Sequence, residues 1–346
     1  MSRDMSNKKH VDLECRYLMI NQRPLCVWGT NIDKSNKDFI DSIDPDYFDY
    51  LRSIHSQAFD RDEIVDLDVQ SQYAALSLRT AYSQSLETLF SLMFSTIQSP
   101  YCVPAWMNSY KNNELKNLVE KVHQGQEPIL SIHGSEKLSW SAIYDRFFPV
   151  DPATKDDFSS ETREGFIKTW SYFADDFLNE SFNLEFNCIK HGLRVRPGGF
   201  KLLFGFTQDG DSLPPEEMME LSNSDFGLSY LKLHSINKNH AQIKYEHRNW
   251  NPKSLMWGLD FSAISIYNFR LVLQVMNGYT NSLSVPLKCP IDTSDFYHRE
   301  SKSRITFSDI CTPSKLTDSL TKEKIDSMYK RGEYIDIFRL EIEDSE

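Results

Sequence analysis

The longest regular pattern in the chain runs from about Asp66 to Ser99, where apolar side chains recur with the period of an α-helix. One arc of the helical wheel carries Val69, Leu76, Leu86, Phe90, Met93 and Ile97. Serine, threonine and glutamine residues occupy the opposite arc, so the pattern predicts a long amphipathic helix. We expect this helix to end at Ser99-Pro100, because a residue before proline disfavours the α conformation.

Three further helices are predicted from periodicity and from end signals. Asn113 precedes an apolar stripe that stops at Gly125, and glycine is the usual residue just beyond a helix. Asn251-Pro252 starts a helix that runs to Asn277-Gly278, because asparagine caps a helix and proline fits its first turn. The stretch from about Thr162 to His191 is apolar on nearly every side. It therefore predicts one helix in the middle of a bundle.

The wheel of this last helix also places a histidine among its apolar side chains. His191 falls in line with the residues of one apolar face, which are Phe166, Trp170, Phe173, Phe177, Leu184 and Cys188. We therefore expect His191 to lie on or beside a seam between helices.

Other segments carry shorter patterns. Beyond Pro197-Gly198-Gly199 the period changes, and residues 200–207, 230–236 and 241–247 read as strands separated by turns at 208–211 and 237–240. Strand-like runs also cover residues 15–20 and 25–28, and short helices are expected within 37–59 and 140–147. Towards the C-terminus we expect a strand near Ile305, a helix over about 321–330 and a final run over 334–342.

Together these patterns predict an α+β protein that is predominantly α. A helical bundle is expected over residues 66–280, with a small antiparallel β-sheet insertion at about 198–250. Residues 1–65 form an N-terminal extension that packs on the bundle, and residues 281–346 form a C-terminal extension. Both extensions are expected to be irregular.

Composition and missing motifs exclude several classes of function. The formal net charge of −12 argues against broad, nonspecific coating of nucleic acid. No apolar run approaches the ~20 residues that span a bilayer, and no secretory signal is present, so we expect a cytoplasmic protein without membrane contact. The six cysteines lack metal-ligand spacing, and neither a P-loop nor an HExxH or GxSxG motif occurs. No metal or cofactor is expected.

Against this acidic background, no Asp or Glu occurs between Phe186 and Gln208. We call residues 187–196 the basic segment, because they contain the candidate functional side chains of this stretch. Its side chains of interest are Asn187, Lys190, His191, Arg194 and Arg196. An imidazole exchanges protons near neutral pH and guanidinium forks suit phosphate oxygens, which indicates RNA backbone or a nucleotide phosphate as ligand. Alternatively, the histidine stabilises a helix C-terminus and the cations form a solvated rim.

The long helix departs from its own pattern at three positions. Arg79, Ser83 and Glu87 lie within the apolar arc, where a polar group needs a partner because unpaired burial costs roughly 2–7 kcal/mol. One interpretation is a structural salt bridge between Arg79 and Glu87. The other is that these residues support the site formed by the basic segment.

An inward Glu on a long helix, followed by a helix ending Asn187-Cys188-Ile189-Lys190-His191-Gly192, resembles the HEPN superfamily, named for higher eukaryotes and prokaryotes nucleotide-binding. Many members are metal-independent ribonucleases of toxin–antitoxin, abortive-infection and CRISPR-linked defence, others only bind nucleotides or partners, and homodimers are common. The family motif is Arg, a polar residue and then His. Phe186 occupies the position of the Arg, so another cation would have to replace it.

The resemblance implies a protein that acts on or binds RNA or a nucleotide in stress or phage defence. His191 would be the general acid or base and Asn187 would position the phosphate or ribose. The groups expected to hold phosphoryl charge are Lys190, Arg194, Arg196 and Arg79, with Glu87 and Ser83 in support. The alternative is a noncatalytic module whose aromatic helices pair with a second copy or with a cognate protein partner.

Overall fold

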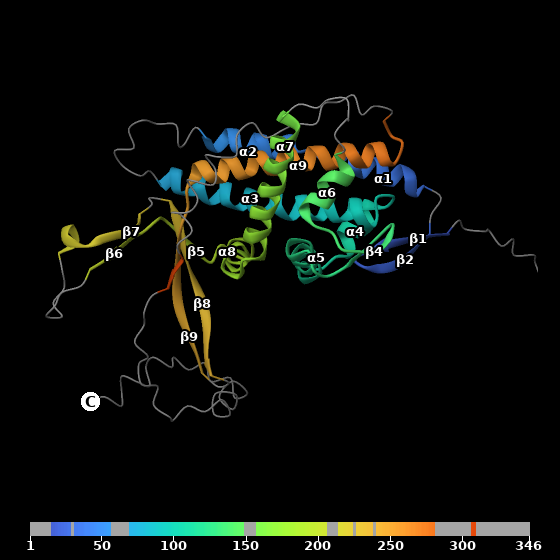
Figure 1. The fold of residues 1–346 in the computed structure, drawn as a ribbon. Helices are drawn as coiled ribbons and strands as arrows, with labels where there is room; N and C mark the ends of the chain where they lie inside the picture. Colours follow the sequence, from blue (N-terminus) through green and yellow to red (C-terminus); the bar gives the residue numbers. More distant parts are fainter. Residues whose placement is uncertain are drawn as a thin grey trace, which may run out of the picture.

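The protein is described from a computed structural model that covers residues 15–28, 31–56, 69–148, 157–205, 214–223, 226–237, 240–280 and 306–308. Its centre is a pair of long helices, α3 (Val69–Gln98) and α9 (Pro252–Met276), which lie side by side (Figure 1). Gly258 permits their close approach, since a Cβ there would lie 2.6 Å from the Tyr82 ring. Asn251 caps α9 by accepting a hydrogen bond from the Lys253 amide, as predicted.

The N-terminal elements pack on this pair. They are the hairpin β1 (Cys15–Ile20) and β2 (Arg23–Trp28), α1 (Ile32–Ser42), α2 (Asp46–Ser56) and α4 (Val103–Ser109). Both α1 and α2 contact α9, and α4 contacts α3. Buried Asn36 joins three segments, because its amide donates to the Pro100 carbonyl and to Asn277 while its oxygen accepts from the Val103 amide. Short elements of the N-terminal region are thus held by specific polar contacts.

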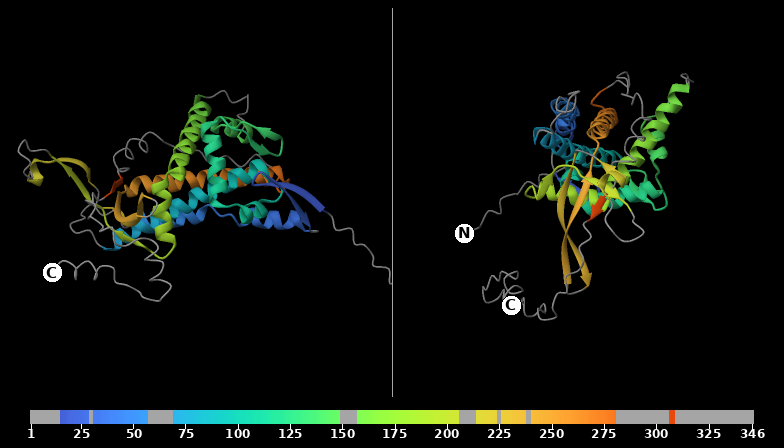
Figure 2. Two further views of the ribbon diagram at one scale, coloured as in Figure 1. Left: turned by 90° about the horizontal axis from the view of Figure 1, so that it is seen from below. Right: turned by 90° about the vertical axis from the view of Figure 1, so that its left-hand side faces the viewer.

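A second layer crosses the long pair. It consists of α5 (Asn112–Gln124), the short hairpin β3 (Ile129–Ser131) and β4 (Gly134–Glu136), α6 (Trp140–Phe147) and α7 (Asp157–Leu178). Its core is aromatic: the Trp170 ring on α7 lies 5.6 Å from the ring of Phe269 on α9 and 6.1 Å from that of Phe148. Figure 2 shows α7 rising steeply across the long helices. Aromatic rings packed at tilted angles therefore hold the two layers together.

The helix predicted over residues 162–191 is two helices. Asn179 interrupts it in an extended conformation and caps α8 (Glu180–Lys190), accepting a hydrogen bond from the Phe182 amide. Asparagine competes with helical hydrogen bonds in this way, which is why it favours caps over helix interiors. The prediction of one continuous helix was wrong, and the phase of the apolar pattern starts anew at Glu180.

The strands form small antiparallel sheets. The main sheet has the order β10 (Thr306–Ser308), β9 (His240–Asn249), β8 (Gly227–Asn237) and β5 (Val195–Pro197), and the β8–β9 hairpin extends away from the bundle (Figure 1). A second pair joins β6 (Lys201–Phe204) to β7 (Met219–Asn223), with the short 3-10 helix η1 (Pro215–Glu217) before β7. The predicted hairpin is confirmed, although the main sheet begins earlier, at Val195.

The predicted fold class, α+β and predominantly α, is confirmed. The predicted turn at 208–211, the helix over 321–330 and the run over 334–342 lie outside the described residues. Among the helices of the described ranges, none is both long enough and apolar enough to cross a membrane.

Candidate functional site

The basic segment begins at the end of α8 and leads into β5. His191 follows the last helical residue, and the backbone then turns through Gly192 and Leu193, both of which have positive φ (110° and 51°). The Leu193 amide donates to the Ile189 carbonyl and the Arg194 amide to the Cys188 carbonyl, at 3.2 and 2.8 Å. These bonds satisfy helix-end carbonyls and fix the direction in which the chain leaves α8.

All five functional side chains of this segment are exposed. They are Asn187, Lys190, His191, Arg194 and Arg196. The expected position of His191 on an interhelical seam was wrong, because the wheel that aligned it with the α7 aromatics continued through the break at Asn179. These side chains are therefore open to solvent.

The two arginines of the segment differ from the other arginines of the described ranges. Seven of those form ion pairs with carboxylates: Arg16, Arg23, Arg52, Arg79, Arg146, Arg163 and Arg248. Arg270 donates to the Asp41 carbonyl. Among the described residues, only Arg194 and Arg196 have neither an ion pair nor a hydrogen bond from the guanidinium. Their donors are free to meet an external anion.

Arg196 extends the basic segment onto the outer face of the main sheet. It pairs with Ser229, which in turn pairs with His247, so the three side chains share one face. Tyr245, the next residue on this face of β9, is 47% exposed, and its ring stacks on that of His247 at 6.2 Å with 24° between the planes. The Ser229 hydroxyl lies 2.6 Å from His247 Nδ1. A cation thus borders an accessible aromatic surface.

Arg79 lies in a different environment, beneath the sheet. Only 3% of it is exposed, and its Nε donates to Glu185 Oε1 on α8 at 2.6 Å. Arg248 of β9 lies 3.0 Å from the other oxygen of Glu185, and the Arg79 guanidinium stacks 3.4 Å above the Phe182 ring. The structural partner of Arg79 is therefore Glu185. The predicted Arg79–Glu87 salt bridge was wrong, since a nearer carboxylate comes from another helix.

The same buried layer contains a second polar pair. Tyr230 of β8 donates from its hydroxyl to Glu246 Oε2 at 2.6 Å, and Lys232 lies 3.1 Å from the other oxygen of Glu246. Burial raises the pKa of Tyr230, and the hydrogen bond to Glu246 raises it further. The first group joins the sheet to the bundle, whereas the second links β8 to β9, and the Tyr230 hydroxyl also lies 3.3 Å from the Ser181 carbonyl of α8. We therefore assign both a structural role.

The remaining predicted site residues, Ser83 and Glu87, also have surroundings of their own on α3. Ser83 donates to the Arg79 carbonyl one turn earlier and stays within α3. Glu87 is half-buried and lines a pocket with residues of α2 and α4. Burial raises the pKa of Glu87, while the positive charges of Lys190 and Lys116 lower it. The charge of Lys190 thus acts on Glu87 from the basic segment.

Phe186 is a core residue, in the position where the resembled family has Arg. It is 6% exposed, and Lys190 Nζ lies 5.6 Å from the centroid of its ring. Lys190 is thus a cation beside the motif position. Cys188 is buried one turn before Gly192, and burial raises the pKa of its thiol, which favours packing over nucleophilic chemistry.

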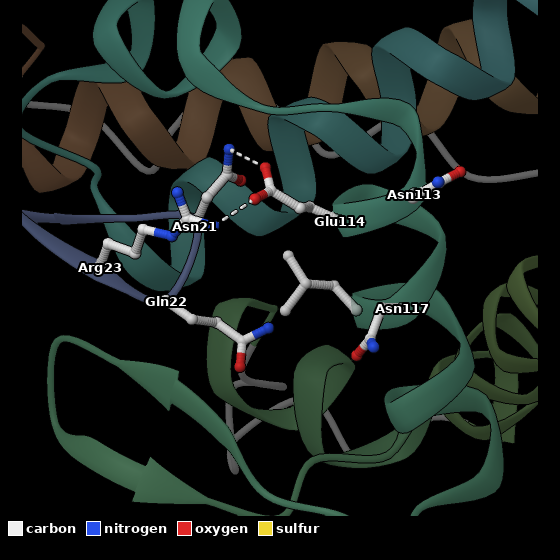
Figure 3. Close-up of a pocket in the computed structure, with 7 residues that line it drawn as sticks. Asn21, Gln22, Arg23, Asn113, Glu114 and Asn117 are labelled. Carbon is white, nitrogen blue, oxygen red and sulfur yellow. Dashed lines mark hydrogen bonds and ion pairs between the residues drawn. The ribbon is translucent and has the colours of Figure 1, made fainter.

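A pocket of about 400 Å³ lies between the β1–β2 turn and the start of α5 (Figure 3). Among the described residues, Glu114 is the only carboxylate that lines it. Arg23 and Asn21 donate hydrogen bonds to its two oxygens, at 2.8 and 3.4 Å. The Lys111 amide also donates to Glu114, completing a helix cap. Both oxygens of Glu114 thus accept hydrogen bonds that join the hairpin to α5, so this carboxylate is not available to a ligand.

The site could hold an anion, but its described part shows no metal centre. No three His, Cys, Asp or Glu side chains within the described ranges gather closely enough to bind a metal ion. The sequence pattern did not single out Tyr245, although the i, i+2 spacing of Tyr245 and His247 in a predicted strand already places them on one face.

Comparison with known proteins adds no relative. No protein-family model matches the chain, and neither a curated protein nor a solved structure matches it.

Proposed function

We propose that this is a cytoplasmic RNA-binding protein that holds single-stranded RNA along the basic segment and the adjoining outer face of the sheet. The observation that supports this most strongly is the pair of exposed guanidinium groups of Arg194 and Arg196, which have no acceptor among the described residues. Phosphate oxygens are suitable acceptors for such forks.

The aromatic surface beside Arg196 favours single strands over duplexes. Unstacked bases bind proteins by stacking on aromatic side chains, at roughly 1–3 kcal/mol per base. Tyr245 offers an accessible ring on the same face as Arg196, and His247 supports that ring from behind. A backbone contact and a stacking contact within one strand length are what a flexible RNA needs.

The geometry supports binding more than cleavage. A general acid or base is usually oriented by a third group, as in nucleophile–base–orienter arrangements. The exposed His191 has no side-chain hydrogen bond to another described residue. The resemblance to ribonucleases stays a prediction, which a comparison of RNA cleavage and cellular toxicity between the wild type and His191→Ala would test.

Fluorescence anisotropy with a labelled single-stranded RNA tests the binding proposal. The double variant Arg194→Ala/Arg196→Ala should weaken binding at least tenfold, because it removes both free guanidinium groups. Tyr245→Leu should weaken it about fivefold or more through lost stacking. A duplex of the same sequence should bind more weakly than the single strand.

The matched control is Arg16→Ala/Arg163→Ala, which removes two arginines that pair with Asp33 and Asp145. It makes the net charge more negative by the same amount, so a purely global charge effect would weaken binding equally in both double variants. Equal weakening, or no detectable RNA binding by the wild type at low salt, would contradict the proposal.

A further inference from the structure

A pocket of about 470 Å³ opens between α2, α3 and α4. This volume lies within the range of about 300–1,000 Å³ that is typical of small-molecule sites. None of the residues of the basic segment lines it, and neither do those of the main sheet. A ligand in this pocket would thus lie apart from the proposed RNA surface, and its binding does not depend on RNA binding.

The walls of the pocket are aromatic on two sides. Tyr47 and Phe48 come from α2, with their rings 5.4 Å apart and edge to face. Tyr110 closes the opposite side, and its ring is stacked on buried Trp106 at 5.0 Å with 23° between the planes. Because Trp106 is itself fixed by a hydrogen bond to Gln98, the Tyr110 ring is held in place before a ligand arrives.

Two polar groups of α3 lie one turn apart in this pocket. Glu87 is half-buried, and burial raises the pKa of its carboxyl. Ser91 is fully enclosed beside Tyr110. Burial raises the pKa of Tyr110, and the hydrogen bond with the Ser91 hydroxyl lowers it in part. Glu87 is therefore the polar group of this pair that a ligand can reach.

The charge of the pocket has one sign. Among the residues that the structure describes, Glu87 and Asp44 are the only charged ones that line it, and no Lys or Arg does. Lys190 and Lys116 act on Glu87 from α8 and α5, but neither comes within 4 Å of it as an ion pair among the described residues. Glu87 therefore forms no ion pair with another described residue.

We propose that this pocket binds a small organic ammonium ion, with its charge against Glu87 and its carbon groups against Tyr47, Phe48 and Tyr110. Aromatic faces attract such cations by about 0.5–2 kcal/mol per ring, more when the site is dry. An anionic ligand would meet two carboxylates, and a neutral apolar ligand would leave Glu87 half-desolvated without a partner.

Choline and its neutral isostere 3,3-dimethyl-1-butanol test the role of charge, since they differ only in replacing the nitrogen by carbon. Titration followed by calorimetry and by saturation-transfer NMR should show choline binding at least tenfold more tightly. Equal affinities for the two compounds, or no binding of choline up to about 50 mM, would overturn the proposal.

Variants locate the site. Glu87→Gln keeps the shape and should weaken choline binding at least tenfold, while Tyr110→Phe keeps the ring and should change it less than threefold. Glu120→Gln removes a carboxylate from the exposed face of α5 and serves as the charge-matched control. RNA affinity and the circular dichroism spectrum of Glu87→Gln should equal those of the wild type. Unchanged choline affinity in Glu87→Gln would refute the assignment.

Discussion

Two pairs of arginines in this protein occupy opposite environments. Arg79 and Arg248 are enclosed between the bundle and the sheet, and they share the two oxygens of one carboxylate, Glu185. Arg194 and Arg196 come shortly after Glu185 in the chain. Both are exposed, and their guanidinium groups have no acceptor among the described residues. The buried arginines thus hold structural elements together, whereas the exposed arginines remain available to bind an external anion.

The difference shows that pairing matters more than the local count of charges. A buried cation must be compensated, because an isolated charge in a dry interior costs many kcal/mol. An exposed cation costs little and gains little from a surface partner, so its free donors indicate binding more than stability. Stability effects should therefore fall as carboxylate–arginine pairs become more exposed.

The largest effect is expected at the buried pair. Glu185→Ala would leave Arg79 and Arg248 without their shared carboxylate, and breaking such a pair costs about 3–5 kcal/mol. Urea denaturation measures this as a lower unfolding midpoint. Glu180→Ala, an exposed position on the same helix, is the control and should cost less than about 1 kcal/mol. Similar losses in the two variants would remove the distinction between the regions.

A partly buried pair should fall in between. Arg146 donates to both oxygens of Glu136, and the hydrogen bonds from Arg146 lower the pKa of Glu136 from its usual 4.5 to about 2. The lowered pKa stabilises the fold fully above pH 4.5, and this contribution is lost as the pH falls towards 2. At pH 7, Glu136→Gln should cost about 2 kcal/mol once solvent screening is allowed for.

Comparing the unfolding free energies of the wild type and Glu136→Gln at pH 7 and pH 3 checks this sign. The gap between them should narrow at pH 3, where Glu136 of the unfolded chain is protonated. A gap that is constant over this range would mean that hydrogen-bond geometry alone, without charge, explains the loss.

A still more exposed pair should act in the opposite direction. Burial raises the pKa of Asp260 to about 6, even though Arg52 lies 2.6 Å away. Since the folded state holds this proton more tightly than the unfolded chain, ionised Asp260 destabilises the fold above pH 6. This penalty disappears as the pH falls towards 4. Asp260→Asn should therefore be more stable than the wild type at pH 7.5, by at most about 1 kcal/mol after allowance for exposure.

Denaturation curves of Asp260→Asn at pH 7.5 and pH 4.5 measure this difference. The advantage of the variant should shrink at the lower pH. A variant that is less stable than the wild type at pH 7.5 would show that the ion pair with Arg52 outweighs the cost of burying Asp260.

The smallest effect on stability is expected at the free arginines. Arg194→Ala/Arg196→Ala removes no ion pair or hydrogen bond with another described residue, so the unfolding free energy should change by less than about 0.5 kcal/mol. Thermal denaturation followed by circular dichroism measures this change. A loss above about 1 kcal/mol would mean that these side chains contribute to the fold, and the contrast with Arg79 would fail.

Much of the helical framework could be predicted from local patterns. The apolar arc of α3, the glycine after α5 and the Asn251-Pro252 start of α9 each reflect interactions within a few residues. Such signals are complete in the sequence, because capping and helical periodicity depend only on neighbours. The strands around the β8–β9 turn were predictable for the same reason.

Two features of the site were not predictable in this way. The exposure of His191 depends on the break at Asn179, since a helical wheel carries no meaning across an interruption that resets its phase. The partner of Arg79 is Glu185, 106 residues away, and the register of two helices and a strand decides that contact. A single sequence contains the need of Arg79 for a partner but does not identify that partner.

The proposed RNA binding requires that Arg194 and Arg196 contact phosphate groups of the RNA backbone. The salt dependence of RNA binding tests this most directly. For single strands, each phosphate contact contributes about −0.7 to the slope of log K against log salt concentration. Arg194→Ala/Arg196→Ala should therefore make the slope shallower by about 1.4, while Arg16→Ala/Arg163→Ala should leave it as in the wild type. An unchanged slope in the first variant would contradict the account.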